Sequence, residues 1–284
     1  MGLNINATKL LLKLKEDGVD FGQVLTLGRQ RLNVPKIQLQ HLLKDFGYAI
    51  SARELKARNK GYCEPFLELL GATKVDSMDV SDYEKATVMH DLNDPIADGI
   101  KGTYKTLIDS GTLEHVFNFP QAIKNCMELI RVGGNYIGMT PCNNFFGHGF
   151  YQFSPELYYR VFSKENGFVV KKMYFFIDDK KASFYEVKDP AEVRERVILN
   201  NAYPAFLFVF AEKVSEQPIF KSTPQQSDYE HIIWKKQKMS KQIGKFIPKP
   251  LRKLPRPLKR IVDGFSLLKN QVGTGDPRFF KKIF

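Results

Sequence analysis

The sequence has few cysteines and no long apolar run. Its 284 residues contain three cysteines, Cys63, Cys126 and Cys142, and no Cys-x-x-Cys pair. This usage predicts reduced thiols in a cytosolic protein. No apolar run approaches the roughly 18 residues that a membrane-spanning helix needs. The first residues also lack the charged and then apolar pattern of a secretory signal. We therefore expect a cytoplasmic protein.

Several catalytic motifs are missing as well. The chain contains no Gly-x-Ser-x-Gly elbow, no Walker loop and no His-Glu-x-x-His. Gly147-His148-Gly149 is no metal motif by itself. A cation-assisted methyl transfer through Asp109 and Glu114 stays an alternative, but their spacing does not support it. The sequence therefore predicts no metal site.

Acidic residues are scarce only at the C-terminal end. Residues 1–234 hold 28 basic and 29 acidic side chains, whereas residues 235–284 hold 15 basic and 2 acidic ones. Four prolines between 248 and 257 interrupt any long helix there. We expect a globular domain over residues 1–220 and a basic tail over residues 221–284.

Three interpretations of the tail are open. The first is attachment to an anionic membrane surface at the inner membrane face, with about 1 kcal/mol from each basic residue close to it. The second is binding to RNA or another polyanion. The third is a solubilising segment that packs partly on the domain. All three concern the tail alone, because the domain itself is nearly neutral.

Strand-like and helical segments alternate along the first 165 residues. Such alternation implies a parallel sheet with right-handed crossovers. The expected elements, in chain order, are a helix at 5–17, a strand at 24–27, helices at 37–46 and 65–70, strands at 74–80, 86–91 and 104–109, a helix at 120–132, a strand at 135–140, a helix at 154–164, a strand at 168–177, a helix at 189–199 and a strand at 205–214.

The most informative stretch covers residues 104–156. One apolar run ends in Asp109-Ser-Gly111-Thr-Leu-Glu114-His115, and a helical segment with a Gly-Gly turn follows. A second apolar run ends in Pro-x-Asn143-Asn144. Polar residues are thus gathered at strand ends, where open α/β sheets bind ligands.

This stretch and the order of elements resemble the class I S-adenosylmethionine-dependent methyltransferases, over roughly residues 20–214. The resemblance implies an α/β, Rossmann-like sheet of seven mostly parallel strands with helices on both faces. Its last strand is antiparallel and inserted beside the sixth. The block from Gly147 to Glu156 is similar to a subgroup of bacterial methyltransferases in surface-glycan biosynthesis. The implied activity is methyl transfer to a sugar or glycan-related small acceptor, at oxygen.

The first strand ends in Leu27-Gly28-Arg29-Gln30, with one glycine where the family has Gly-x-Gly-x-Gly. The resemblance implies that Gly28 lies against the methionine part of S-adenosylmethionine. Arg29 or Gln30 would then meet the carboxylate of the cofactor. The alternative is a plain strand-to-loop turn.

Acids end the second and third strands. The resemblance implies that Asp79 receives the ribose hydroxyls, because one carboxylate can accept from both. Asp76 and Asp82 flank it, and a solvated turn acid is the alternative. Asp91 is expected to accept from the adenine amino group while the backbone N–H of Leu92 meets a ring nitrogen. Alternatively, Asp91 caps the next turn.

The fourth and fifth strands are expected to carry the chemistry. Asp109 and Gly111 would lie where the methyl group of the cofactor is held. A hydroxyl acceptor must lose a proton, and histidine is the usual general base near neutral pH. We predict His148 as that base. His115 would orient the substrate or make a structural hydrogen bond.

Asn143, Asn144 and Tyr151 are expected to line the acceptor pocket, although asparagine also suits tight loops. Two rival functions stay open. One is a non-catalytic binding protein on the same fold, which the missing glycines favour. The other is an RNA methyltransferase guided by the basic tail.

Overall fold

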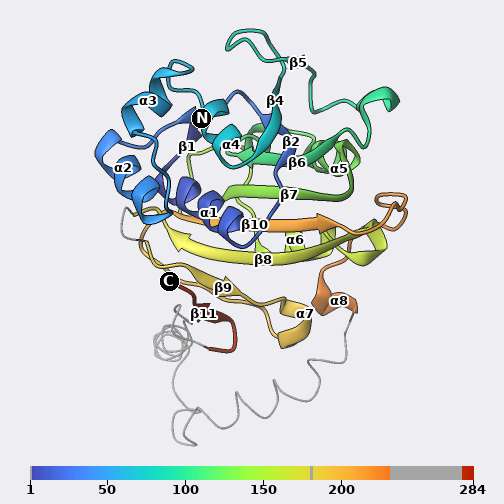
Figure 1. Ribbon diagram of the computed structural model, residues 1–284. Helices are drawn as coiled ribbons and strands as arrows, with labels where there is room; N and C mark the ends of the chain where they lie inside the picture. Colours follow the sequence, from blue (N-terminus) through green and yellow to red (C-terminus); the bar gives the residue numbers. More distant parts are fainter. Residues whose placement is uncertain (1, 180–181, 231–276) are drawn as a thin grey trace, which may run out of the picture.

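The computed structural model describes residues 2–179, 182–230 and 277–284. These ranges form a nine-stranded sheet and a separate two-stranded sheet (Figure 1). From edge to edge, the large sheet contains β11 (Phe280–Lys282), β9 (Tyr185–Val187), β8 (Phe168–Ile177), β10 (Ala205–Lys213), β7 (Ile130–Asn143), β6 (Tyr104–Ser110), β2 (Gly22–Leu27), β4 (Ala72–Asp79) and β5 (Val88–Met89). The small sheet pairs β1 (Gly2–Leu3) with β3 (Arg31–Leu32).

The large sheet is parallel in one half and antiparallel in the other. Strands β5, β4, β2, β6 and β7 pair in parallel. Strand β10 lies between β7 and β8 and is antiparallel to both. The predicted Rossmann-like α/β sheet, with an antiparallel last strand beside the sixth, is therefore confirmed. The predicted number of seven strands is corrected, because β9 and β11 extend the antiparallel edge.

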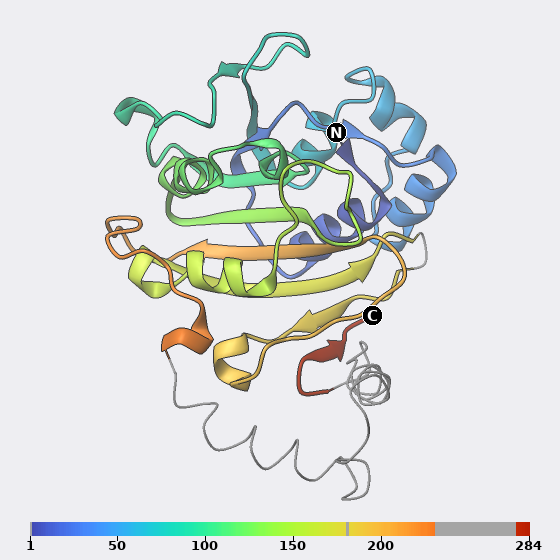
Figure 2. The same cartoon turned by 180° about the vertical axis from the view of Figure 1, so that it is seen from behind.

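Helices cover both faces of the sheet, as predicted. The helices form two groups, one on each face of the sheet, and a separate apolar core packs each group against its face. Figures 1 and 2 show the two faces in turn. The first group contains α1 (Ile5–Glu16), α2 (Lys36–Asp45), α3 (Ala52–Ala57) and α4 (Glu64–Leu69), and the second contains α5 (Phe119–Leu129) and α6 (Pro155–Val161).

The helix starts follow local chemistry. The side chain of Ser154 accepts a hydrogen bond from the backbone N–H of Leu157 at 3.3 Å, with Pro155 at the first helical position of α6. Helix α3 was not predicted. Ser51 and Glu54 have the spacing of a capping box, and the Ser51 hydroxyl accepts from the Glu54 N–H at 3.1 Å. That spacing is the sequence signal for this missed helix.

Three predicted elements change their boundaries. The strand expected at 86–91 is only β5, Val88–Met89, because it pairs at the sheet edge with β4 alone. The helix expected at 120–132 ends at Leu129, and β7 begins at once at Ile130. The expected helix at 189–199 shortens to α7 (Pro190–Val193), where Arg194 turns into the left-handed region at φ +56°.

The described ends of the expected tail lie on the domain. Phe279 and Phe280 are buried, and β11 pairs with β9. The backbone N–H of Ile283 donates to the Phe184 carbonyl at 2.8 Å. The short helix α8 (Ser227–Glu230) is held by the Ser227 hydroxyl, which donates to Glu156 at 3.0 Å. The division at residue 220 stays a prediction.

The most basic part of the tail falls within residues 231–276, which lie outside the described residues. Its membrane and RNA interpretations therefore stay predictions. Among the described residues, no helix combines the length and the apolarity needed to cross a bilayer.

We predict that Phe280→Ala lowers the free energy of unfolding by about 3 kcal/mol, because it empties a buried aromatic site beside Phe175. Urea unfolding of the full chain measures this. The matched control is Lys281→Ala, an exposed position on the same strand. Equal stability of the two variants would show that β11 does not contribute to the core.

Candidate active site

The predicted site residues lie at the tips of adjacent strands. Leu27 of β2 pairs with Met78 of β4, and Asp79 of β4 pairs with Met89 of β5. Strand β6 is aligned with β2, because Thr26 of β2 pairs with Ile108 of β6. Parallel strands end at the same edge, so Gly28, Asp79, Asp91 and Asp109 follow one another along it.

The turn after β2 is tied to its neighbours. Gly28 has φ +65°, and its backbone N–H donates to the Met78 carbonyl at 2.7 Å. Arg29 is directed to helix α4, where its Nε donates to Glu64 at 2.6 Å. Gln30 is fully buried and donates from Nε2 to the Leu27 carbonyl at 2.5 Å, while its Oε1 has no hydrogen-bond partner within the described part of the chain. Of the two side chains predicted to meet the cofactor carboxylate, Arg29 is therefore occupied by an ion pair.

Two acids at the outer tips remain accessible. Asp79 is partly exposed, and the one hydrogen bond that it accepts from the described residues is a long one of 3.3 Å, from the Ser81 N–H. Asp91 is exposed and accepts from the Asn93 N–H at 2.9 Å, so it caps the next turn, as the alternative interpretation stated. This bond holds the pKa of Asp91 below its usual range. Leu92 is buried behind it.

The tip of β6 contains a buried acid. Asp109 is fully buried, and its Oδ1 accepts from the Thr112 N–H at 2.9 Å. The hydroxyl of Thr112 donates to the Leu27 carbonyl at 3.0 Å, which ties this loop to the tip of β2. Gly111 turns the chain with φ +89°.

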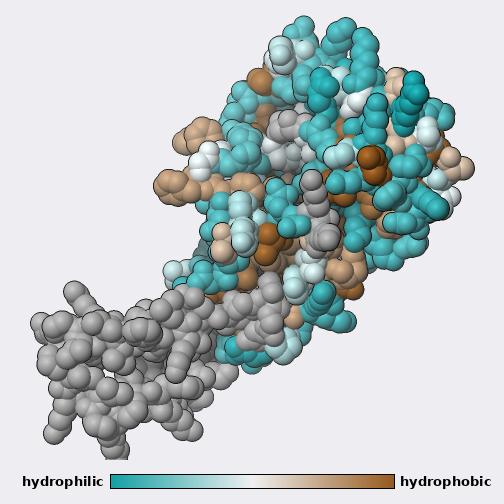
Figure 3. Space-filling model, turned by 90° about the vertical axis from the view of Figure 1, so that its left-hand side faces the viewer, coloured by the Kyte–Doolittle hydropathy of each residue, from teal (hydrophilic) through white to brown (hydrophobic). Residues whose placement is uncertain are grey.

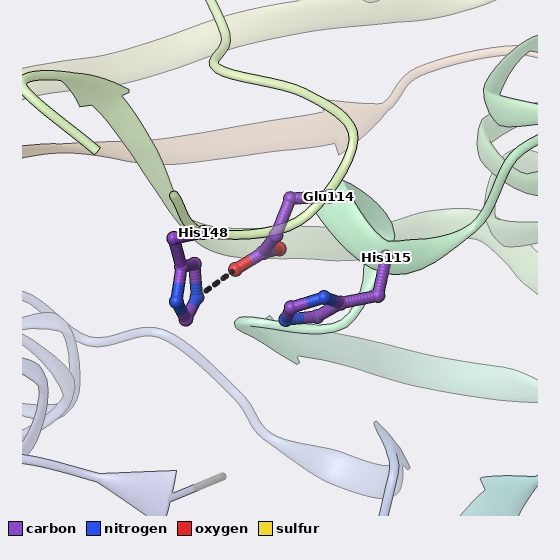
Figure 4. Close-up of side chains that lie close together, drawn as sticks. All are labelled: Glu114, His115 and His148. Carbon is purple, nitrogen blue, oxygen red and sulfur yellow. Dashed lines mark ion pairs between the residues drawn. The ribbon is translucent and has the colours of Figure 1, made fainter. Parts of the chain in front are cut away.

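Three side chains converge just beyond this tip (Figure 4). Glu114 and His115 lie in the short 3₁₀ helix η2 (Leu113–His115), and His148 lies on the loop after β7. Nε2 of His148 is 3.5 Å from Oε1 of Glu114. The rings of His115 and His148 meet edge to face, with centroids 4.9 Å apart. The structure thus brings together the two predicted catalytic histidines and adds Glu114.

A close backbone contact holds His148 in this place. The Glu114 carbonyl accepts hydrogen bonds from the N–H groups of Phe150, at 2.8 Å, and of Tyr151, at 3.3 Å. Gly149 has φ +74°, and a Cβ there would lie 2.7 Å from the Glu114 carbonyl oxygen. Glycine is therefore required at position 149 for the loop to approach η2.

Burial sets the electrostatics of this cluster. It raises the pKa of Asp109 and the pKa of Glu114, and the Asp109 charge raises that of Glu114 further. The two carboxyls therefore retain a proton to higher pH than ordinary acids do. Burial, and then the nearby His148, lower the pKa of His115, which favours its neutral imidazole.

The predicted acceptor-pocket residues support the surrounding loops. Asn143 Nδ2 donates to Asn201 at 2.5 Å, and Asn144, at φ +60°, donates to the Tyr203 carbonyl at 3.0 Å. The Tyr151 hydroxyl donates to the Phe117 carbonyl at 2.6 Å. These bonds match the loop-geometry alternative, and a pocket role for the three residues stays a prediction.

Aromatic side chains near the cluster are unusually exposed. Phe117, Phe146 and Phe150 expose 72%, 100% and 65% of their surface. Figure 3 views the molecule from the side on which β8 ends. Apolar side chains project there from a mostly hydrophilic surface. Sequence reasoning missed these rings, and it weighed Glu114 only together with Asp109 for a cation-assisted reaction, not beside the two histidines. The available signal was the adjacent Glu114-His115 pair at one strand end with Gly147-His148-Gly149 after the next strand.

No protein-family model matches this chain, and no curated protein matches it. Solved structures similar to it include a geranyl diphosphate methyltransferase in complex with S-adenosylmethionine, which is 16% identical over 74% of this chain and 85% of its own, with a TM-score of 0.39. Another is the 1,6-didemethyltoxoflavin-N1-methyltransferase of Burkholderia thailandensis, 12% identical over 74% and 78%, also with a TM-score of 0.39.

A third similar structure has a different activity. The branched-chain polyamine synthase of Thermus thermophilus, in complex with N4-aminopropylspermidine and 5'-methylthioadenosine, is 11% identical, with a TM-score of 0.34. The match covers 78% of this chain and 61% of that one.

We predict that Gly149→Ala lowers the free energy of unfolding by about 1–2 kcal/mol, the cost of a Cβ in the left-handed region. Gly147→Ala is the matched control, because a Cβ at that glycine meets nothing within 4 Å. Urea unfolding compares the two variants. Equal losses in both would contradict the close contact with Glu114.

We also predict that Asp109→Asn weakens the pH dependence of stability. The native state binds the Asp109 proton more tightly than the unfolded chain does, whose carboxyl has a pKa of 3.8. Parent stability should therefore fall as pH rises above about 4 and through the raised native pKa, and the variant should lose part of this fall.

Unfolding free energies of the ligand-free protein, measured from pH 4 to pH 8, test this expectation. Asp82→Asn removes an exposed carboxyl and serves as the control. An Asp109→Asn profile as steep as that of the parent would overturn the burial argument.

Proposed function

We propose that this chain is an S-adenosylmethionine-dependent methyltransferase that acts on a hydroxyl of a sugar or glycan-related small acceptor. The observation that carries the proposal is the shared edge of the parallel strands. An accessible acid, Asp79, ends β4 there, and another, Asp91, stands in the loop after β5. The Glu114, His115 and His148 cluster follows β6 and β7. Open α/β sheets bind their ligands at this edge.

The side chains fit the cofactor in part. Asp79 has carboxylate oxygens available for ribose hydroxyls, since the bond of 3.3 Å that one of them accepts from the Ser81 N–H is long. Gly28 and Gly111 both have positive φ, so the chain turns without a Cβ at the tips of β2 and β6. Gln30 has an orphaned buried oxygen that the amino group of the methionine part could use as an acceptor.

The acceptor side is the exposed histidine cluster. When bound, the cofactor supplies an electrophilic methyl group. The residues of this chain hold the acceptor oxygen in line with it and remove the proton of the hydroxyl. His148 is half exposed and lies against the buried Glu114 carboxyl. As the general base, its imidazole would take the proton of the hydroxyl. Phe117 and Phe150, whose ring centroids are 5.6 Å apart, offer apolar faces for a sugar ring.

A second candidate is a binding protein on the same fold without methyl transfer. The ion pair of Arg29 with Glu64 favours it, because this cation is then unavailable to a cofactor carboxylate. The RNA methyltransferase alternative depends on the tail, whose basic part lies outside the described residues.

We predict that Asp79→Ala weakens S-adenosylmethionine binding by about tenfold to a hundredfold, because it removes charge-assisted hydrogen bonds to the ribose. Isothermal titration calorimetry measures the affinity. His148→Ala should keep the affinity of the parent and slow turnover by about a hundredfold or more.

Asp82→Ala is the control for loss of an exposed acid in the same loop. No cofactor binding by the parent would favour a different ligand at this edge. Equal cofactor affinity of Asp79→Ala and the parent would remove the ribose assignment alone.

A further inference from the structure

The convergence of Glu114, His115 and His148 has the composition of a metal site. One carboxylate and two imidazoles offer ligand atoms that all lie within 4.8 Å of one another. This donor set suits zinc and related divalent transition ions, whereas magnesium prefers oxygen ligands. We propose that these three side chains bind a divalent transition-metal ion of the zinc class and leave one coordination position open.

A buried, unpartnered atom points independently to a cation. Glu114 is 1% exposed, and its Oε2 has no hydrogen-bond partner among the described residues. A carboxyl oxygen that is buried without a hydrogen-bond partner is costly. Backbone contacts do not relieve it, since the bonds from Phe150 and Tyr151 end on the Glu114 carbonyl. A metal ion beside the carboxylate would compensate this cost.

The spacing of the ligand atoms is close to what an ion needs. Zinc bonds of about 2.0–2.2 Å in a tetrahedron place ligand atoms roughly 3.4 Å apart. The distance from His148 Nε2 to Glu114 Oε1 is 3.5 Å. Other ligand atoms of the cluster lie further apart, and rotation of the two exposed imidazole rings would bring them closer together (Figure 4).

The backbone would support such a site from two directions. Glu114 and His115 are held by η2, which follows β6. At Gly149 the loop that carries His148 packs closely against the backbone carbonyl of Glu114. His148 is 49% exposed, so the remaining coordination position faces solvent. A catalytic metal site characteristically combines three protein ligands with one such open position.

The use of the open position rests on the proposed function, whereas ion binding does not. An acceptor hydroxyl bound there would lose its proton to solvent water, because a bound divalent ion lowers the pKa of its oxygen ligand. The acceptor oxygen would then form its bond to the methyl group as the methyl–sulfur bond breaks, with S-adenosylhomocysteine as the leaving group. In the ion-bound enzyme His148 is a ligand, and the ion takes over the activation of the hydroxyl.

Calorimetric titration of the chelator-treated full chain with Zn²⁺ tests the site without cofactor. We expect one Zn²⁺ per chain, and Mg²⁺ binding at least a hundredfold weaker. His148→Ala and Glu114→Gln should each weaken Zn²⁺ binding at least tenfold. His41→Ala, which removes an exposed histidine from α2, should keep the affinity of the parent.

Zn²⁺ affinity equal to that of the parent in His148→Ala would overturn the proposal, as would no Zn²⁺ binding by the parent. If Glu114→Gln fails to fold by circular dichroism, His115→Ala replaces it, since that position is exposed. S-adenosylmethionine binding is titrated separately on the metal-free chain. Zn²⁺ binding without cofactor binding would support the metal site and reject the proposed methyltransferase. Cofactor binding without Zn²⁺ binding would reject the metal site and leave the proposed methyltransferase in place.

Discussion

The parallel register of five strands is the constraint on which the candidate site depends. The pairs Leu27–Met78, Asp79–Met89 and Thr26–Ile108 align the ends of β2, β4, β5 and β6. The pair Asp109–Gly138 places β7 beside β6, and β7 continues beyond this edge to Asn143. Side chains alternate between the two faces of a strand, so a slip of one residue in β4 or β6 would turn its terminal acid to the opposite face. The register therefore determines which polar groups share one edge, before any loop contributes.

Along that edge, solvent exposure divides the polar groups into two kinds. Asp79 and Asp91 face solvent, as suits groups that exchange water for a ligand. Asp109 and Glu114 are buried, and their protonation is shifted by the loss of water around them. Such a site has exposed acids at one end and buried acids beside imidazoles at the other. It can bind a polar ligand at the exposed end and change the protonation state of a group at the buried end.

The sequence was sufficient for the parts of the fold that continuous apolar runs encode. The strand expected at 168–177 is β8 without change, and that at 104–109 is β6 within one residue. Strand β11 could not be foreseen, because its Phe-Lys-Lys sequence has no strand period and its partner β9 is far away in the chain. The histidines were found from their places after strand ends, but the burial of Glu114 depends on the distant loop that folds over it.

The outermost strand also affects how the molecule meets other copies of itself. Strand β11 is short, and the side chains of Lys281 and Lys282 are exposed on it. Unpaired strand edges are templates for intermolecular pairing, and lysines there repel a second copy. A C-terminal cleavage before Phe279 would expose β9 as a new edge beside the aromatic rings of Phe175 and Phe184. The last residues of the chain thus cover a strand edge that would otherwise be open to pairing with another molecule.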